Sequence, residues 1–311
     1  MKARCSPYKK MQGYGILKHM EVSFEGGGAV LKGMSCFEPR HIFDNGQTFR
    51  FDEVEEGVFE GVAHGRFLRV TKKGNRITLY PCGAEEYEQV WKRYFDLETD
   101  YGMLFCDCGD EALEKGRQYG CGLRLLNQPP FETLVSFIVS ANNNLKRIKG
   151  IIRRICERCG RPFVFEGKTY YAFPEADKLA ALSVEALKEC GSGYRAPYIK
   201  ETARMVAGGF DLEGLRAKSY GDAKKELMEL PGVGPKVADC ILLFSLGFRD
   251  AFPADVWIKR VLKEHYGFAG NDRQVYAFAR KRFGKYAGIA QQYLFFWQRD
   301  KDRNDGEKNT I

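Results

Sequence analysis

The sequence predicts an α+β fold, in which an N-terminal antiparallel β-sheet domain with covering helices is followed by an all-α domain. Short runs of β-branched and aromatic residues, separated by turn-forming residues, occupy the first third of the chain. Beyond residue 108 the apolar residues recur at helical spacing instead. The chain has 311 residues, which is enough for two or three subdomains.

The first domain, residues 1–105, contains a series of strand-like runs. They are Gln47–Phe51, Val58–Val62, Arg66–Thr71 and Arg76–Tyr80. Turn-forming residues that include glycine separate them, and the last two runs are expected to pair as a hairpin. After Gly83 the pattern becomes helical, which supplies the cover for the sheet.

The second domain, residues 106–298, is predicted to be helical nearly throughout. The expected helices are Phe131–Val139, Leu145–Cys159, two short ones within Pro174–Leu187, Tyr198–Val206, Ala223–Leu230, Lys236–Leu246, Val256–Tyr266, Gln274–Phe283 and Ala287–Trp297. Residues 222–247 should hold two helices joined by a tight hairpin. Residues 299–311 are charged and lack apolar periodicity, so we expect a frayed tail there.

The charge balance permits a polyanionic partner without proving one. Lysine and arginine number 49 against 41 acidic residues, a net charge of +8. No stretch resembles a signal peptide, and the apolar runs are too short to span a bilayer. We therefore expect an intracellular protein, a monomer without a membrane partner.

The cysteines do not form a recognisable framework. Ten are present, at irregular spacings that argue against a secreted disulfide-bonded domain. Cys156 and Cys159 have the spacing of a metal-binding pair, but no second pair accompanies them and they lie in a predicted helix. We expect free thiols and no metal site.

The most informative stretch is Leu230–Cys240, which reads LPGVGPKVADC. Gly232 and Gly234 allow a tight turn, and Pro235 suits the first position of the helix that follows. Free backbone N–H groups at such a helix start suit a phosphate group. Lys236 and Cys240 are four residues apart, so both should project from the same helix face.

A second acidic signal follows at Asp255. It comes after Phe252-Pro253-Ala254 and directly before another helical run, which is a helix N-cap position. A carboxylate there can be purely structural. Its combination with the preceding lysine motif favours a catalytic site instead.

These two motifs together resemble the helix-hairpin-helix DNA glycosylases, which carry a Gly/Pro-rich loop and an aspartate. The similarity is greatest to the 8-oxoguanine DNA glycosylase branch, and motif stretches match in order from Asn45 to Phe295. The resemblance implies that the second domain is a helix-hairpin-helix glycosylase core. Some relatives carry a four-cysteine iron–sulfur loop after the aspartate. No cysteine follows Cys240 here, so we expect no cluster.

The resemblance also implies roles for individual residues. Lys236 would be the nucleophile and Asp255 its catalytic partner. The flipped base would be bound by Gly46, Cys240, Gln291 and Phe295, with the Gly46 carbonyl accepting a hydrogen bond from the N7–H that guanine lacks. Asn142, Arg147 and Arg195 would contact the orphaned cytosine, and Tyr194 would wedge into the duplex. The backbone of Gly232, Val233 and Gly234 would hold a phosphate, with a monovalent cation as a further possibility at this hairpin.

Taken alone, several of these residues have plainer interpretations. Asn142 lies in a run that is typical of a polar turn and cap, and Tyr194 or Phe295 could simply be core aromatics. A glycosylase for another lesion, or a non-catalytic DNA-binding module, would also use such a hairpin. The resemblance favours a bifunctional enzyme that excises 8-oxoguanine opposite cytosine from duplex DNA and nicks the abasic site through a lysine Schiff base. This chemistry implies no redox cofactor and no catalytic metal.

Overall fold

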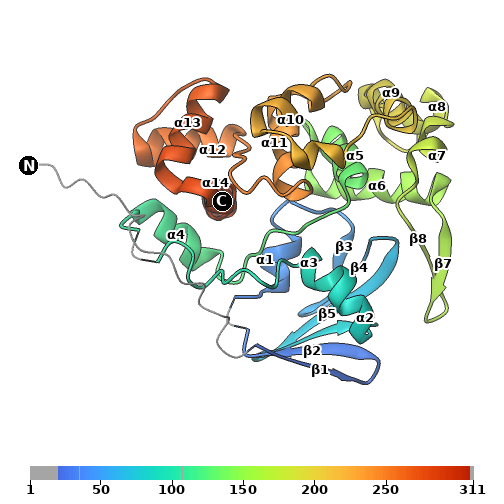
Figure 1. The fold of residues 1–311 in the computed structure, drawn as a ribbon, viewed down its shortest axis with the longest axis horizontal. Coiled ribbons are helices and arrows are strands. Elements are labelled where there is room, and N and C mark those ends of the chain that lie inside the picture. Colours follow the sequence, from blue (N-terminus) through green and yellow to red (C-terminus); the bar gives the residue numbers. More distant parts are fainter. Residues whose placement is uncertain (1–19, 35, 107, 309–311) are drawn as a thin grey trace, which may run out of the picture.

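The computed structural model describes residues 20–34, 36–106 and 108–308, and it confirms the predicted α+β fold. An antiparallel sheet domain is followed by a helical domain, and each surrounds a hydrophobic core of its own (Figure 1). None of the described helices is both long and apolar enough to cross a bilayer.

The sheet has six strands in the order β1-β2-β6-β5-β4-β3. They are β1 (Glu21–Glu25), β2 (Gly28–Lys32), β3 (Phe51–Glu55), β4 (Val58–Ala63), β5 (Arg66–Lys73) and β6 (Arg76–Tyr80). Side chains alternate between the faces, so Ile77 and Leu79 of β6 are buried while their neighbours are only partly covered. The predicted hairpin between the last two runs is confirmed as β5 paired with β6.

Short helices pack against this sheet. They are α1 (Pro39–Phe43) and a continuous run formed by α2 (Ala84–Glu86), a π-helical turn (Tyr87–Trp91) and α3 (Lys92–Tyr94). Phe43 stacks on Phe51 of β3 with ring centroids 4.2 Å apart, and Trp91 is fully buried. Aromatic packing therefore joins the helices to the sheet.

The strand predicted at Gln47–Phe51 is wrong except for its last residue, which begins β3. The Gln47 side chain is buried and donates to the carbonyls of Ile42 and Arg124, at 2.9 and 2.8 Å. Its Oε1 also accepts from the Leu126 N–H at 2.9 Å. These long-range bonds hold the segment as a loop. Strands β1 and β2 were not among the predicted runs.

The helical domain follows from residue 111. Its helices are α4 (Glu111–Tyr119), α5 (Pro130–Ser140), α6 (Leu145–Cys159), α7 (Ala176–Ala180), α8 (Val184–Glu189), α9 (Ala196–Ala207), α10 (Tyr220–Leu227), α11 (Pro235–Phe244), α12 (Val256–Tyr266), α13 (Asp272–Phe283) and α14 (Ala287–Lys308). Single 3₁₀ turns lie at Gly193–Arg195, Gly214–Ala217 and Gly284–Tyr286. Helices α6 and α12 have the predicted bounds.

A small hairpin interrupts this domain, contrary to the nearly all-helical prediction. Strands β7 (Pro162–Phe165) and β8 (Lys168–Tyr171) pair across a turn in which Glu166 and Gly167 have positive φ. Phe165 stacks on Phe67 of the sheet domain with centroids 4.4 Å apart. The hairpin thus packs against the sheet domain, a distant contact that local periodicity does not reveal.

The last helix is longer than the sequence predicts. We expected a helix ending at Trp297 and a frayed tail from residue 299, whereas α14 continues to Lys308. Arg299 is buried, and its Nη1 donates to the Asp44 carbonyl at 2.9 Å. A helix that is already anchored by packing can continue through charged residues without an apolar stripe. The final three residues of the predicted tail, 309–311, lie outside the described part of the chain.

Arg124 joins the two domains through backbone carbonyls. It is 1% exposed and donates to the carbonyls of Phe95, Asp96, Thr99 and Cys36 at 2.5–2.9 Å. Its guanidinium also lies 4.3 Å from the ring centroid of Tyr101. One buried side chain of the second domain therefore satisfies four carbonyls of the first domain.

We expect Arg124→Leu to lower the free energy of unfolding by roughly 3–5 kcal/mol, because it leaves several buried carbonyls without a donor. Equilibrium denaturation in urea measures the loss. Arg158→Leu is the matched control, since its ion pair with Glu189 is on the surface and is worth about 0–1 kcal/mol. Equal losses in the two variants would contradict this role for Arg124.

Candidate active site

The turn between α10 and α11 requires glycine at position 232. Gly232 has φ +82°, and a Cβ there would lie 2.9 Å from Tyr198 Cβ and 3.2 Å from Ile138 Cγ2. The preceding carbonyl, of Pro231, accepts a hydrogen bond from Thr202 Oγ1 at 2.9 Å. Packing against α5 and α9 therefore fixes the hairpin in place.

The tip of this hairpin presents backbone donors. Gly232 and Gly234 are exposed, while the Val233 side chain between them is buried and anchors the turn. Among the described residues, no acceptor is recorded for the N–H groups of Gly234, Lys236 or Val237. Free donors at the positive end of a helix suit a phosphate group.

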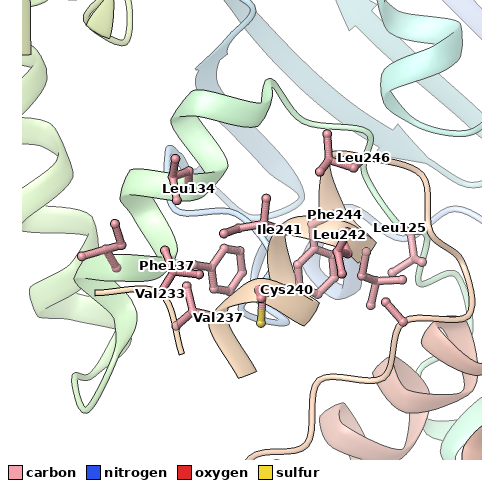
Figure 2. Packing of buried hydrophobic residues seen from close by; sticks show 14 of the residues in the cluster. Leu125, Leu134, Phe137, Val233, Val237, Cys240, Ile241, Leu242, Phe244 and Leu246 are labelled. Carbon is pink, nitrogen blue, oxygen red and sulfur yellow. The ribbon is translucent and has the colours of Figure 1, made fainter. Parts of the chain in front are cut away.

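Lys236 lies on the first turn of α11, half-buried against α5. Its Nζ is 5.2 Å from the ring centroid of Phe137. One turn further along, Cys240 is buried, and Figure 2 shows it beside Val237 and Phe137. Burial raises the pKa of the Cys240 thiol to about 11, although Lys236 partly offsets this effect. The thiol is therefore neutral near pH 7 and adds no second charge beside Lys236.

Asp255 is the N-cap of α12. Its Oδ1 accepts from the backbone N–H groups of Trp257 and Ile258 at 3.1 and 3.0 Å. Burial raises the pKa of the Asp255 carboxyl, while the Ile258 N–H and the charge of Lys236 act in the opposite direction. The structure thus brings Lys236 and Asp255 within electrostatic reach of each other. An amine beside a fixed carboxylate can act as a nucleophile.

A second group of predicted residues meets at the loop between α5 and α6. Arg195 is buried and donates to the carbonyls of Ala141 and Asn142, and Asn142 itself is exposed with φ +49°. Tyr194 is 60% exposed, so it is not a core aromatic, and its ring lies 4.3 Å from the Arg195 guanidinium. Arg147 is exposed on the first turn of α6, and no hydrogen bond is recorded between its side chain and the other three residues.

A third group forms around α14. Gly46, with φ +85°, faces Phe295, since a Cβ at position 46 would lie 3.8 Å from that ring. Gln291 is buried on the same helix, and its Oε1 accepts from Gln292 Nε2 at 2.8 Å. The base-binding residues expected from opposite ends of the sequence therefore include one pair, Gly46 and Phe295, that is in contact range.

Sequence reasoning missed Arg299, which supports this third group. Its guanidinium lies 5.6 Å from the ring centroid of Phe295, and Nη1 donates to the carbonyl of Asp44. It thus connects α14 to the loop that carries Gly46. The bond joins residues 255 positions apart, so no local pattern could have indicated it.

Asp239 was also missed, although it lies inside the motif. It is buried between Lys224 Nζ at 2.8 Å and Tyr220 OH at 2.7 Å, and burial raises its pKa to about 6. Both partners belong to α10, so these bonds fix the two helices of the hairpin to each other. The described residues contain no group of three His, Cys, Asp or Glu side chains that could hold a metal ion.

Comparison with protein-family models matches the chain in two consecutive blocks. Residues 29–134 match the 8-oxoguanine DNA glycosylase N-terminal domain. Residues 135–285 match the HhH-GPD superfamily base excision DNA repair protein model. The boundary between the blocks falls within α5.

Individual relatives agree with these matches. The chain is 38% identical over 232 residues to a probable N-glycosylase/DNA lyase of Methanothermobacter thermautotrophicus, covering 68% of this chain and 73% of that protein. It is 32% identical to the N-glycosylase/DNA lyase of Saccharomyces cerevisiae, covering 70% and 69%. A Clostridium acetobutylicum 8-oxoguanine glycosylase/lyase, solved with double-stranded DNA containing cytosine opposite 8-oxoG, superposes with a TM-score of 0.86 at 38% identity, covering 91% and 98%.

Proposed function

Because the chain belongs to the 8-oxoguanine DNA glycosylase branch of the HhH-GPD superfamily, we propose that it is a bifunctional base excision enzyme. It removes 8-oxoguanine from duplex DNA and cleaves the strand at the resulting abasic site. The observation that carries this proposal is the juxtaposition of Lys236 and Asp255 beside a hairpin with free backbone donors.

Substrate binding requires the damaged nucleotide to leave the helix, because its glycosidic bond is not reachable in the stack. The hairpin residues Gly232–Gly234 hold a backbone phosphate, and the same hairpin is where a monovalent cation, if bound, would add positive charge for that phosphate. The flipped base is bound between Phe295 and Cys240, and its N7–H donates to the Gly46 carbonyl. Guanine lacks this hydrogen and would leave a buried carbonyl unpaired, which is costly.

The chemistry follows from an amine nucleophile. The unprotonated Nζ of Lys236 attacks C1′, and the bond from C1′ to N9 breaks with its electron pair leaving on the base, which takes up a proton. The covalent adduct opens to a Schiff base as the bond from C1′ to O4′ breaks and O4′ takes up a proton. β-Elimination then removes a proton from C2′ and breaks the C3′–O bond with the 3′ phosphate as leaving group, which nicks the strand 3′ to the lesion. Asp255 stabilises the cationic sugar in the transition state.

The partner is therefore double-stranded DNA containing oxidised guanine, bound by a monomer. Asn142, Arg147 and Arg195 contact the orphaned cytosine, and Tyr194 fills the gap that the flipped nucleotide leaves. The exposed position of Tyr194 and the Arg195 bonds that fix the Asn142 loop support this arrangement. The reaction requires no redox cofactor or catalytic metal, because the lysine supplies the nucleophile.

Borohydride trapping tests this proposal on duplexes that carry 8-oxoguanine opposite each of the four bases. We expect a covalent enzyme–DNA adduct that is strongest opposite cytosine and absent from a matched duplex with unmodified guanine. Base release without an adduct would indicate a hydrolytic glycosylase. Intact DNA binding with no release from any of the duplexes would contradict the proposed substrate and favour another lesion or a non-catalytic binding module.

A further inference from the structure

Asn45, directly before Gly46, has a fully buried side chain to which the proposed mechanism assigns no task. Its Oδ1 accepts a hydrogen bond from the Gln47 N–H at 3.0 Å. Its Nδ2 is buried and has no hydrogen-bond partner among the described residues. A buried amide that makes only part of its hydrogen bonds adds little net stability to the fold. The bond to Gln47 is therefore better explained by its effect on Gly46, the residue that it spans.

This bond determines the direction of the Gly46 carbonyl. The Gln47 N–H and the Gly46 carbonyl belong to the same trans peptide group, in which the two bonds point in opposite directions. Because Asn45 holds the N–H, the carbonyl is directed away from the Asn45 side chain. Gly46 has φ +85°, and glycine has a wider range of backbone conformations than other residues. A side-chain bond is thus needed to keep this peptide in one orientation.

The residues on both sides of Gly46 are held in place. The Asp44 carbonyl accepts from Arg299 Nη1 at 2.9 Å, and the buried Gln47 side chain makes three hydrogen bonds of its own. By contrast, no donor is recorded for the Gly46 carbonyl among the described residues. Gly46 is half-buried, and it faces the Phe295 ring. One unpaired acceptor therefore lies beside Phe295 in a loop that is otherwise fixed.

We propose that Asn45 is a positioning residue, which holds the Gln47 N–H and thereby aims the Gly46 carbonyl at the N7–H of 8-oxoguanine. This inference rests on the proposed function, because it concerns how that carbonyl recognises the damaged base. Asn45 acts through the peptide group and does not itself touch the base. Its contribution is therefore confined to bases that carry a hydrogen on N7, and it is absent when the flipped nucleotide has no base.

Two substitutions at this position differ only in the acceptor. Asn45→Ala removes it, whereas Asn45→Ser keeps an oxygen that can accept from the N–H two residues ahead, as hydroxyl groups do in short turns. Both substitutions leave a similar space in the core. A difference between the two variants therefore reports the hydrogen bond and not the lost packing.

The test measures affinity for three duplexes with cytosine opposite the variable position, which holds 8-oxoguanine, guanine or a tetrahydrofuran abasic-site analogue. The first two carry a 2′-fluoro sugar, which disfavours the cationic transition state and so prevents excision. We expect Asn45→Ala to bind the 8-oxoguanine duplex roughly fivefold to tenfold more weakly, the effect of about one hydrogen bond. Its affinity for the tetrahydrofuran duplex should be unchanged, and its affinity for the guanine duplex should not fall. Asn45→Ser should regain most of the loss.

Asn271→Ala is the matched control. The Asn271 Oδ1 accepts from the Gln274 N–H at 3.0 Å at the start of α13, so the substitution removes the same kind of bond at a position that the mechanism does not use. It should lower the Tm, because a helix cap is lost. The ratio of its affinities for the 8-oxoguanine and tetrahydrofuran duplexes should remain that of the wild-type protein.

A wild-type affinity ratio in Asn45→Ala would overturn the inference. Equal losses in Asn45→Ala and Asn45→Ser would also overturn it, because lost packing would then be the cause. Parallel losses for all three duplexes would show a purely structural role and would overturn it as well. The proposed function fails in a different way: wild-type protein would then bind the 8-oxoguanine duplex no more tightly than the guanine duplex and would give no borohydride adduct.

Discussion

Lys236→Gln is expected to abolish both base excision and strand cleavage, a loss of roughly four orders of magnitude or more in single-turnover rate. Glutamine has a similar length but offers neither a nucleophilic lone pair nor an amine that forms an imine. Gel assays for base release and for nicking measure the two steps separately, and borohydride trapping should give no adduct.

The fold should tolerate this substitution. Lys236 is only half-buried, and among the described residues no hydrogen bond is recorded that joins its side chain to another element. We therefore expect Lys236→Gln to unfold at nearly the wild-type temperature and to bind lesion-containing DNA. This separation of binding from chemistry distinguishes the enzyme from a DNA-binding module, in which the same substitution would change little.

Lys225→Gln is the matched control. Lys225 is an exposed lysine of α10, so its loss removes the same charge without changing any residue of the candidate site. Base excision should remain close to wild type apart from a small effect of salt-dependent DNA binding. If Lys236→Gln still released the base at a measurable rate, water would be the nucleophile and the lysine would have another task.

The helices could be predicted accurately where their apolar spacing and their caps agree. In α6, Ile148, Ile151, Ile152 and Ile155 form one buried face, and Asn144 caps the first turn. Its predicted and observed bounds coincide. The helix hairpin could also be predicted, because glycine and proline residues mark its turn directly in the sequence.

What could not be predicted depends on partners that are distant in the sequence. The Gln47 segment has strand-like composition, but its side chain bonds to residues near position 125 and holds it as a loop. Arg299 lies in a charged stretch, but it is buried because its guanidinium donates to the Asp44 carbonyl and packs on the Phe295 ring.

We expect Asp255→Asn to slow base excision on the order of a hundredfold to a thousandfold, because it removes a charge that stabilises the developing cation on the sugar. The asparagine Oδ1 can still accept from the N–H groups of Trp257 and Ile258, so the cap of α12 is retained. The single-turnover excision rate reports the catalytic effect of the charge, and the unfolding temperature reports the stabilising effect of the cap.

Asp255→Ala provides the comparison. It removes both the charge and the cap, so it should lose activity to a similar extent and, in addition, about 1 kcal/mol of stability. If Asp255→Asn were as active as wild type while Asp255→Ala was impaired, the aspartate would be a structural cap only. The catalytic role would then be wrong.

The pH dependence offers an independent check on this carboxylate. Burial raises the pKa of Asp255, so the charged form is lost at a higher pH than it is for an exposed aspartate. Excision by the wild-type enzyme should therefore fall as the pH decreases through this raised pKa and recover as the pH increases above it. Asp255→Asn has no group to titrate there, so its residual rate should lack this acid limb. If the excision rates of both enzymes fell at low pH with the same midpoint, the titrating group would be one other than Asp255.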